Sequence, residues 1–327
     1  MKKALITDFV WPDIEIEGEV LRAAGVEPFA APDASEETLA GLAVDADVIL
    51  FCFAKVTGNV LRAATKCVVA CRYGIGVDNV DIEAATAAGI VVTNVPDYCM
   101  DEVGDHTLGM ILALNRRFVP HDRAVKAGGW SAVALDRPMH RTRGATLGIV
   151  GFGRIGRSVA AKAKALGMET VAFDPLHAPG GRIDGVEIGT FEEVLERAEF
   201  VTVHTPLTPE TEGIIGAAEL ARMKPGSIIV NCARGGIIDE EALAHALASG
   251  HLAGAGLDVL SAAPPPADHP LLGLENVIVT PHTAFFSQAS TIELERRTAE
   301  EAVRVLNGEM PEHLVNPEVL GRTRIGL

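Results

Sequence analysis

The chain has 327 residues, of which 48% are hydrophobic and 22% charged, which excludes a disordered or fibrous protein and suits about two globular domains of ~150 residues each. With 28 basic and 44 acidic residues the net charge is −16, which disfavours partners such as nucleic acids and anionic membranes. Five cysteines without a CxxC pair favour reduced thiols and argue against disulfides or a metal site. Asp8 interrupts the N-terminal apolar stretch, and no run approaches the ~20 residues that cross a bilayer. We therefore expect a soluble, cytoplasmic protein.

The first third of the chain alternates short apolar runs with segments of helical period, a pattern typical of parallel sheets with crossover helices. It predicts strands at residues 3–7, 47–51, 67–70 and 89–93, and helices near 17–24, 58–64 and 82–88. The acidic run from Glu15 to Glu19 is expected to be a solvated helix start. A longer helix is predicted over about 101–115, and residues 118–146 are expected to form an arm or loop.

A second block of the same kind opens at Thr146. Strands are predicted at TLGIV, TVAFD, FVTVH, SIIVN, AGAGLDV and NVIVT, and the last helix is predicted over 288–306. The fold class is therefore α/β, with doubly wound parallel sheets.

One segment carries the signature of a dinucleotide-binding loop. Gly151, Gly153 and Gly156 form a GxGxxG between a predicted strand and a predicted helix. Such glycines permit a tight turn and a close backbone approach to a pyrophosphate, which the helix N-terminus attracts. Asp174 ends the next strand, where a carboxylate would bind ribose hydroxyls and repel a 2′-phosphate, so NAD is favoured over NADP. The alternative is a glycine-rich turn in another α/β fold.

Polar residues follow three further predicted strands, at the edge where open α/β sheets place ligands. They are Arg234 after SIIVN, Asp258 in AGAGLDV and His282 after NVIVT. Hydride transfer to a 2-keto acid requires a cation for the carboxylate and a proton donor for the developing alkoxide. Arg234 and His282 are the candidates for these two roles. A structural salt bridge for Arg234 and a packing role for Asp258 are the alternatives.

Over nearly its whole length the sequence resembles the D-isomer-specific 2-hydroxyacid dehydrogenases. The resemblance rests on Gly151 to Gly156, HTPLTPETEGIIG, MKPGSIIVNCARGGIIDEEAL, GAGLDV, DHPL and VTPH. Within the family, the segments CRYGIGVDNVDIEAA, NVPDYCMDEVGDHTLG and PHTAFFS are similar to the branch that contains the C-terminal-binding proteins.

This resemblance implies a substrate domain of residues 1–100 and 288–327, into which a Rossmann-type NAD domain of residues 101–287 is inserted, with the active site in the cleft between them. It also implies a homodimer formed through the helix and arm at about 101–145. The implied catalytic residues are Arg234 and His282. The implied NAD-binding residues are Gly151, Gly153, Arg154, Ile155, Gly156, Asp174, His204, Thr205, Pro206, Thr211, Cys232, Ala233, Arg234, Asp258 and His282. The implied substrate-binding residues are Arg72, Tyr73, Gly74, Ile75, Gly76, Tyr98, Arg234 and Phe285.

One position departs from the family pattern. The family has a glutamate, five residues after the aspartate of the LDV strand, that orients the catalytic histidine and keeps it protonated, and here Ala263 stands in its place. Without a carboxylate partner, His282 loses a source of raised pKa. The leading prediction is NAD-dependent interconversion of a small 2-keto acid and a D-2-hydroxy acid. The alternatives are a dinucleotide-sensing, corepressor-like protein with little turnover, and a dehydrogenase for an atypical acid that itself replaces the missing carboxylate.

Overall fold

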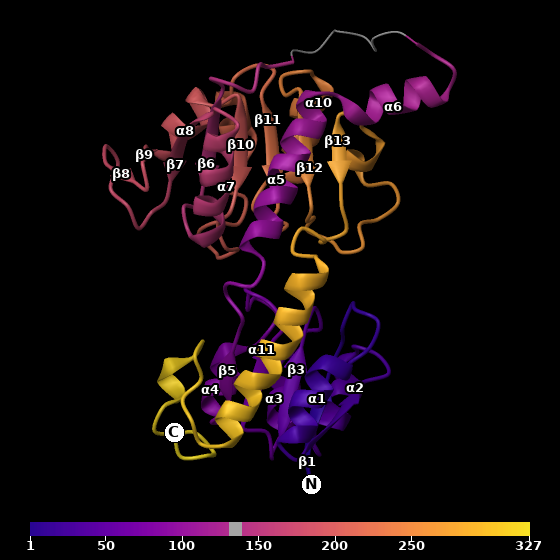
Figure 1. Cartoon of the computed structure of the whole chain (residues 1–327), viewed down its shortest axis with the longest axis vertical. Helices are drawn as coiled ribbons and strands as arrows, with labels where there is room; N and C mark the ends of the chain where they lie inside the picture. Colours follow the sequence, from indigo (N-terminus) through magenta and orange to yellow (C-terminus); the bar gives the residue numbers. More distant parts are fainter. Residues whose placement is uncertain (131–138) are drawn as a thin grey trace. The chain divides into compact units, whose positions relative to one another are not determined.

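The computed structural model describes residues 1–130 and 139–327, which form two compact units. Unit 1 consists of Met1–Tyr98 and Ser287–Leu327, and unit 2 consists of Cys99–Phe286. In Figure 1 the indigo start of the chain and the yellow end belong to the same unit. The C-terminal segment is therefore part of the first fold rather than an appendage of the second.

Unit 1 contains a five-stranded parallel sheet in the order β2-β1-β3-β4-β5. Its strands are β1 (Lys2–Ile6), β2 (Val26–Ala30), β3 (Val48–Phe51), β4 (Val69–Arg72) and β5 (Val91–Thr93). Its helices are α1 (Glu15–Ala23), α2 (Glu36–Ala43), α3 (Gly58–Ala63), α4 (Ile82–Ala87) and α11 (Gln288–Leu306), followed by a short 3₁₀ helix at Pro317–Val319. This strand order is a doubly wound arrangement, which confirms the predicted class.

The returning C-terminal segment completes the core of unit 1. Helix α11 packs against α1 and β4. Beyond it, the fully buried Asn316 accepts the N–H of Val92 at 2.8 Å and donates to the carbonyl of Ile90 at 3.0 Å. A residue 224 positions away in sequence therefore provides hydrogen-bond partners for main-chain groups at the edge strand β5.

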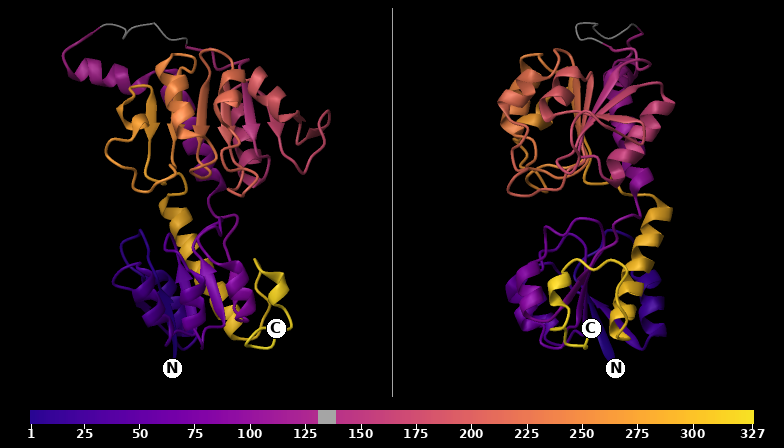
Figure 2. Two further views of the ribbon diagram at one scale, coloured as in Figure 1. Left: turned by 180° about the vertical axis from the view of Figure 1, so that it is seen from behind. Right: turned by 90° about the vertical axis from the view of Figure 1, so that its left-hand side faces the viewer.

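Unit 2 contains an eight-stranded sheet in the order β13-β12-β11-β10-β6-β7-β9-β8, parallel except for the β8–β9 pair. Its strands are β6 (Thr146–Val150), β7 (Glu169–Phe173), β8 (Arg182–Ile183), β9 (Val186–Ile188), β10 (Phe200–Val203), β11 (Ile228–Asn231), β12 (Gly254–Leu257) and β13 (Val277–Val279). Its helices are α5 (Met100–Asn115), α6 (Phe118–Lys126), α7 (Arg154–Ala165), α8 (Phe191–Arg197), α9 (Ala217–Arg222) and α10 (Glu240–Ala248), with a 3₁₀ helix at Pro270–Gly273. Figure 2 shows helices on both faces of this sheet.

The strand order of unit 2 reverses at β6. The chain moves outward from β6 through β7 to β9, and then returns to place β10 on the other side of β6. In doubly wound sheets, ligands bind at the carboxyl ends of the strands beside such a switch point. The segments after β6 and β10 are therefore the first place to look for a binding site.

Three features differ from the sequence-based expectations. Strand β2 was not predicted because Pro28 interrupts it, and the structure tolerates this proline because β2 is an edge strand that pairs only with β1. The region expected to be an arm or loop contains helix α6, which buries no side chain and so carries no core-facing pattern; residues 131–138 of that region lie outside the described residues. Glu17, expected in a solvated helix start, is 0% exposed.

None of the described helices is both long and apolar enough to cross a membrane.

Candidate active site

The glycine-rich loop joins β6 to α7. Gly151 has φ +94°, and a Cβ there would lie 2.6 Å from the carbonyl carbon of His204, the residue after β10. A Cβ on Gly156 would lie 2.3 Å from the carbonyl oxygen of Gly151. Both positions therefore require glycine, one for the turn against β10 and the other for the close approach of α7 to that turn.

The N-terminus of α7 is open. Gly153 is the N-cap residue, no side chain caps its helix, and a Cβ on Gly153 would meet no described atom within 4 Å. The N–H groups of the first turn have no partner within the helix, and the helix dipole makes this end attractive to anions. Arg154 is the first residue of α7, and the first turn contains no acidic residue. This cradle fits a pyrophosphate group.

Asp174 follows β7 directly and reaches back to the same loop. Its Oδ2 accepts the N–H of Phe152 at 2.8 Å, and its Oδ1 accepts the N–H of Leu176 at 2.9 Å. An ionised carboxylate has about four acceptor sites, so capacity remains for ribose hydroxyls. The structure therefore places Asp174 beside the glycine loop.

The segment after β10 lies on the other side of the point where the strand order reverses. Burial lowers the pKa of His204 to about 3, so its imidazole is neutral, and its Nε2 lies 2.9 Å from Thr202 Oγ1. Thr211 Oγ1 donates to the carbonyl of Pro206 at 2.6 Å and accepts the N–H of Thr208 at 2.7 Å. His204 thus contributes shape rather than charge, and Thr211 fixes the loop that contains Thr205 and Pro206.

Arg234 lies in a turn that Asn231, the last residue of β11, holds in place. Asn231 Nδ2 donates to the carbonyl of Arg234 at 2.8 Å, and Asn231 Oδ1 accepts the N–H of Ala233 at 2.9 Å. Burial raises the pKa of the Cys232 thiol to about 12, so this cysteine is not a nucleophile at neutral pH. Cys232 is 8% exposed and lies in the same turn, between Asn231 and Ala233.

Asp258 organises the turn that carries His282. Its carboxylate accepts the hydroxyl of Thr280 at 2.5 Å and the N–H groups of Thr283 and Ala284 at 2.9 Å each. The N–H of His282 donates to the carbonyl of Asp258 at 2.8 Å. Asp258 is 1% exposed, so these bonds form in a low dielectric, where each is strong and costly to lose.

His282 itself has φ +52°, a backbone conformation that non-glycine residues seldom adopt and that is found more often at functional sites. Its ring packs edge-on against Phe285, with 6.3 Å between the ring centroids. Four bonds to Asp258 from the turn around it hold this conformation.

His106 is a member of the site that the sequence did not reveal. It lies on α5, where a packing or capping role was expected. Its Nε2 is 3.0 Å from Thr280 Oγ1 and 3.7 Å from Asp258 Oδ1. The contact spans 174 residues of sequence, so no local pattern could have disclosed it.

In unit 1, the predicted carboxylate-binding loop follows β4. Its carbonyl groups are occupied: that of Gly74 accepts from Val95 N, that of Ile75 from Asn94 Nδ2 at 2.7 Å, and that of Gly76 from Arg72 Nε at 3.0 Å. The N–H groups of Ile75 and Gly76 donate to no acceptor among the described residues. A loop with bonded carbonyls and available N–H groups suits an anion.

Buried side chains next to this loop fix the position of its backbone. Arg72 is 7% exposed and donates to the carbonyls of Tyr73 and Gly76. Tyr73 is 1% exposed and its hydroxyl donates to Glu17 at 2.9 Å. Tyr98, the other predicted substrate residue, is 9% exposed. In this structure Arg72 and Tyr73 shape the loop, and the groups it offers to a ligand belong to the main chain.

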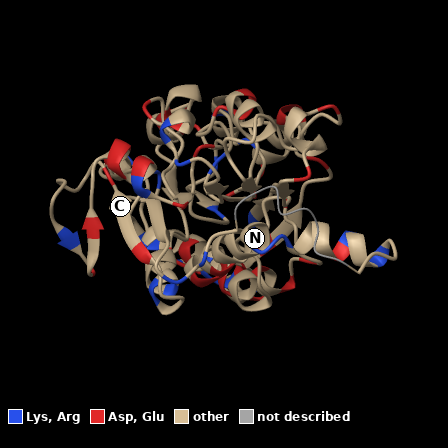
Figure 3. Ribbon diagram, turned by 90° about the horizontal axis from the view of Figure 1, so that it is seen from above, with Lys and Arg blue, Asp and Glu red and all other residues tan. Residues whose placement is uncertain are grey.

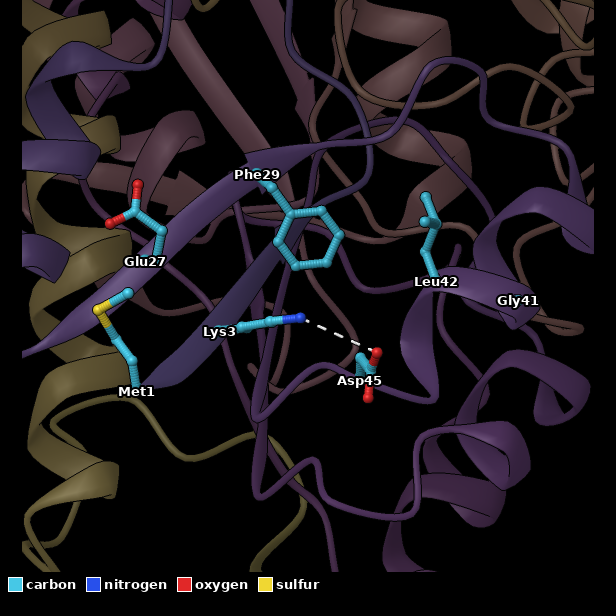
Figure 4. Close-up of a pocket in the computed structure, with 7 residues that line it drawn as sticks. All are labelled: Met1, Lys3, Glu27, Phe29, Gly41, Leu42 and Asp45. Carbon is cyan, nitrogen blue, oxygen red and sulfur yellow. Dashed lines mark ion pairs between the residues drawn. The ribbon is translucent and has the colours of Figure 1, made fainter.

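A cavity of about 330 Å³ in unit 1 lies elsewhere. Figure 4 shows it at the start of β1 and β2, where Lys3 and Asp45 form an ion pair at 3.9 Å. The carboxylate-binding loop follows the carboxyl end of β4, and all strands of this sheet are parallel. The cavity is therefore at the opposite edge of the sheet and is not part of the candidate site.

The candidate residues fall into two sets. In unit 2, the carboxyl edge of one sheet carries the glycine loop, Asp174, His204, the Arg234 turn, Asp258 and His282, each after its own strand. In unit 1, the predicted substrate residues Arg72, Tyr73, Gly74, Ile75 and Gly76 lie at the end of β4 and in the loop that follows it, whereas Arg234 and Phe285 belong to unit 2. Among the described residues, no group of three or more His, Cys, Asp or Glu side chains could hold a metal ion.

Residues 108–284 match the family profile described as D-isomer specific 2-hydroxyacid dehydrogenase, NAD binding domain. The chain belongs to this family. Unit 2 therefore contains the NAD-binding domain that this family shares, and the predicted family and cofactor are confirmed. The glycine loop, the open end of α7 and Asp174 fit that cofactor.

Two curated relatives and one solved structure illustrate the match. The D-3-phosphoglycerate dehydrogenase of Methanocaldococcus jannaschii is 41% identical over 340 aligned positions, which cover 100% of this chain and 62% of the relative. The chain thus spans less than two thirds of that relative. The glyoxylate reductase of Korarchaeum cryptofilum is 40% identical, with 81% of each chain covered. The D-lactate dehydrogenase of Aquifex aeolicus, solved with NAD and lactic acid, superimposes with a TM-score of 0.87 at 26% identity, covering 95% of this chain and 98% of that one.

Proposed function

We propose that the protein interconverts a small 2-keto acid and a D-2-hydroxy acid with NAD as the hydride carrier. The observation that carries the proposal is the single sheet edge in unit 2, where the glycine loop follows β6, the Arg234 turn follows β11 and the His282 turn follows β13. Its members supply an anion cradle, a guanidinium and an imidazole, which are the groups that this reaction needs. The matched relatives are enzymes, so a dinucleotide sensor with little turnover is not favoured.

Each residue has a defined part in this proposal. Bound NADH would supply the hydride to the carbonyl carbon. Arg234 binds the substrate carboxylate and orients the carbonyl group, because a guanidinium pairs with a carboxylate through two parallel hydrogen bonds. His282 donates a proton to the oxygen as its negative charge develops, and accepts that proton in the reverse direction. The N–H groups of Ile75 and Gly76 are the donors that unit 1 offers to a carboxylate.

The substitution at Ala263 bears on the substrate. Ala263 offers no acid, and the nearby carboxylates are engaged: Glu240 binds the Ser261 hydroxyl at 2.7 Å and His269 Nε2 at 2.9 Å, while Asp258 binds the His282 turn. A substrate with an acidic group of its own could supply the missing partner of His282. A dehydrogenase for such an atypical acid is therefore the second candidate function.

The proposal is tested by steady-state oxidation of NADH with a panel of 2-keto acids that includes glyoxylate, pyruvate and dicarboxylic keto acids. Turnover of at least one substrate, with a D-configured product and loss of activity in Arg234→Ala, supports the proposal. NADH binding without turnover of any panel member contradicts it. A strong preference for keto acids with a second acidic group favours the atypical-substrate form.

We also propose a homodimer formed through the region of about 101–145, which contains α5 and α6. Helix α6 buries no side chain, and Phe118 and Trp130 are 58% and 89% exposed. Apolar side chains this exposed are typical of a protein–protein contact. Sedimentation of the parent protein and of Phe118→Glu tests this: a dimer that dissociates in the variant supports the interface.

The remaining partner predictions stay proposals. The net charge is −16, and Figure 3 shows acidic positions spread over many elements, which opposes nucleic-acid binding. The five cysteines are free and buried, which suits a reducing cytoplasm.

A further inference from the structure

A buried acidic network lies beneath the carboxylate-binding loop of unit 1. Glu17 on α1 is 0% exposed and Glu295 on α11 is 3% exposed. Glu17 Oε1 accepts the hydroxyl of Tyr73 at 2.9 Å and the indole N–H of Trp11 at 3.4 Å. The rings of Trp11 and Tyr73 pack edge to face, with 4.9 Å between their centroids. Two side chains, Tyr73 and Trp11, thus donate to one buried carboxylate.

The second carboxylate oxygen of Glu17 lacks a hydrogen-bond donor. Oε2 is buried and receives no hydrogen bond from a described donor group. The side chain of Glu295, on the helix that packs against α1, interacts with that of Glu17. Two ionised carboxylates in such a buried site would repel each other strongly, whereas one proton between them satisfies both. Burial and the adjacent Glu17 raise the pKa of Glu295 to about 8.

No described cation neutralises the pair, because no lysine, arginine or histidine forms an ion pair or hydrogen bond with Glu17 or Glu295 in the described chain. Asp13, in the segment before α1, adds a further negative charge that favours protonation of Glu295. On the side of Tyr73, burial raises the pKa of Cys52 to about 12 and that of Cys71 further, so both thiols are neutral.

The other acid on the buried face of α11 is engaged elsewhere. Both oxygens of Glu301 accept the N–H of Glu312, at 3.0 and 3.1 Å. Glu301 therefore takes no part in the network around Glu17.

We propose that Glu17 and Glu295 are positioning residues for substrate binding: they share one proton, and through Tyr73 they hold the loop whose N–H groups bind the substrate carboxylate. This inference rests on the proposed function, because it assigns the Ile75 and Gly76 N–H groups to the substrate. Tyr73 connects the acidic pair to the loop. Its hydroxyl donates a hydrogen bond to Glu17, and its main-chain carbonyl accepts one from Arg72. Loss of the shared proton leaves two adjacent negative charges, which displace Tyr73 and loosen the loop.

Trp11 reports on the pair without any substrate. The chain has two tryptophans, and the second, Trp130, is 89% exposed, so Trp130→Phe leaves Trp11 as the only emitter. In this background, Trp11 emission is expected to change with an apparent pKa near that of the pair. Glu295→Gln removes the titration, because an amide N–H replaces the shared proton permanently. Glu300→Gln, at an exposed position of the same helix, is the matched control and keeps the titration.

The link to substrate binding is tested by KM and kcat over the same pH range, with each value divided by that of Glu295→Gln. Above the transition, the ratio of the parent's KM to that of Glu295→Gln is expected to rise about three- to tenfold, while the ratio of the two kcat values changes little. Tyr73→Phe, which keeps the ring but loses the hydroxyl, raises KM about tenfold at all pH values, as expected for loss of a hydrogen bond to a charged group.

The two measurements separate the possible failures. Trp11 emission that does not titrate, or that titrates equally in Glu295→Gln, overturns the shared proton. A titration that is lost in Glu295→Gln, together with KM profiles that do not differ between parent and variant, overturns the positioning role. Absence of turnover with every 2-keto acid, while the emission titration is present, overturns the proposed function instead.

Discussion

The main-chain N–H of His282 donates to the main-chain oxygen of Asp258 at 2.8 Å, so the candidate proton donor is tied directly to the end of β12. The Asp258 carboxylate continues the attachment on the other side of His282, where it accepts the N–H of Ala284 at 2.9 Å. The aspartate therefore controls where the imidazole lies without needing to touch its ring. This arrangement leads to the first prediction.

Replacement of Asp258 by alanine should lower kcat/KM by about 100-fold, since a displacement of ~1 Å at a reacting group costs a factor of this order. Thr280→Val removes only one of the bonds to Asp258 and should cause a smaller loss. Steady-state kinetics check both variants, and circular dichroism shows whether they are folded. Equal activities of folded Asp258→Ala and the parent would show that the His282 turn keeps its conformation without the Asp258 carboxylate.

Ala263→Glu tests the departure from the family pattern. The parent should reduce keto acids more slowly as the pH rises through neutrality, because less His282 is protonated and Ala263 provides no carboxylate to hold its proton. The glutamate should extend the active range to higher pH and increase the reductive rate on ordinary keto acids. The check is the pH profile of the reductive rate for parent and variant.

Two results would count against this reasoning. A parent profile that stays flat to about pH 8 or above would show that His282 keeps its proton by other means. A loss of rate in Ala263→Glu on the preferred substrate would point to a substrate group that occupies the place of the glutamate.

Asp174→Ser should shift the cofactor preference. The carboxylate that repels a 2′-phosphate is removed, so the KM for NADPH should fall while that for NADH rises, each by about tenfold. The variant also loses the acceptor for the N–H of Phe152, so part of the NADH effect comes from a looser glycine loop. Kinetics with both cofactors check the result, and Asp184→Ser, at an exposed position of the same unit, is the control. An unchanged ratio would remove Asp174 from cofactor selection.

The glycine loop and Asp174 were predictable because their requirements are local. Gly151 and Gly156 are needed by the backbone of a single turn, and Asp174 follows the next strand in sequence. The doubly wound class was likewise visible in the alternation of elements, although Pro28 concealed an edge strand.

The supporting contacts were not predictable, because they join residues distant in sequence. Glu17 lies 56 residues before Tyr73, and His106 lies 174 residues before Thr280. The acidic residues around Glu17 suggested that its side chain is exposed to solvent. In the structure α11 packs against α1, and Glu17 is buried. Whether a polar residue is buried thus depends on which distant elements pack against it. Local sequence periodicity carries no information about such contacts.

The last prediction concerns the pH dependence of stability that follows from this burial. The pKa of Glu295 is raised from 4.5 to about 8 in the folded protein by burial and by the adjacent Glu17. Between these two values the unfolded chain has lost a proton that the folded chain keeps, so the free energy of unfolding falls as the pH rises. The contribution is fully present below pH 4.5 and is lost as the pH rises through about 8.

Glu295→Gln should abolish this dependence, because an amide has no proton to lose in this range. At a pH above the transition, the melting temperature of the variant should exceed that of the parent by a few degrees, and at acidic pH the two should converge. Calorimetric scans at a series of pH values check the prediction, with Glu300→Gln as the exposed control on the same helix. Parallel melting curves for parent and Glu295→Gln at every pH would mean that the folded protein does not raise the pKa of Glu295, and would contradict the prediction.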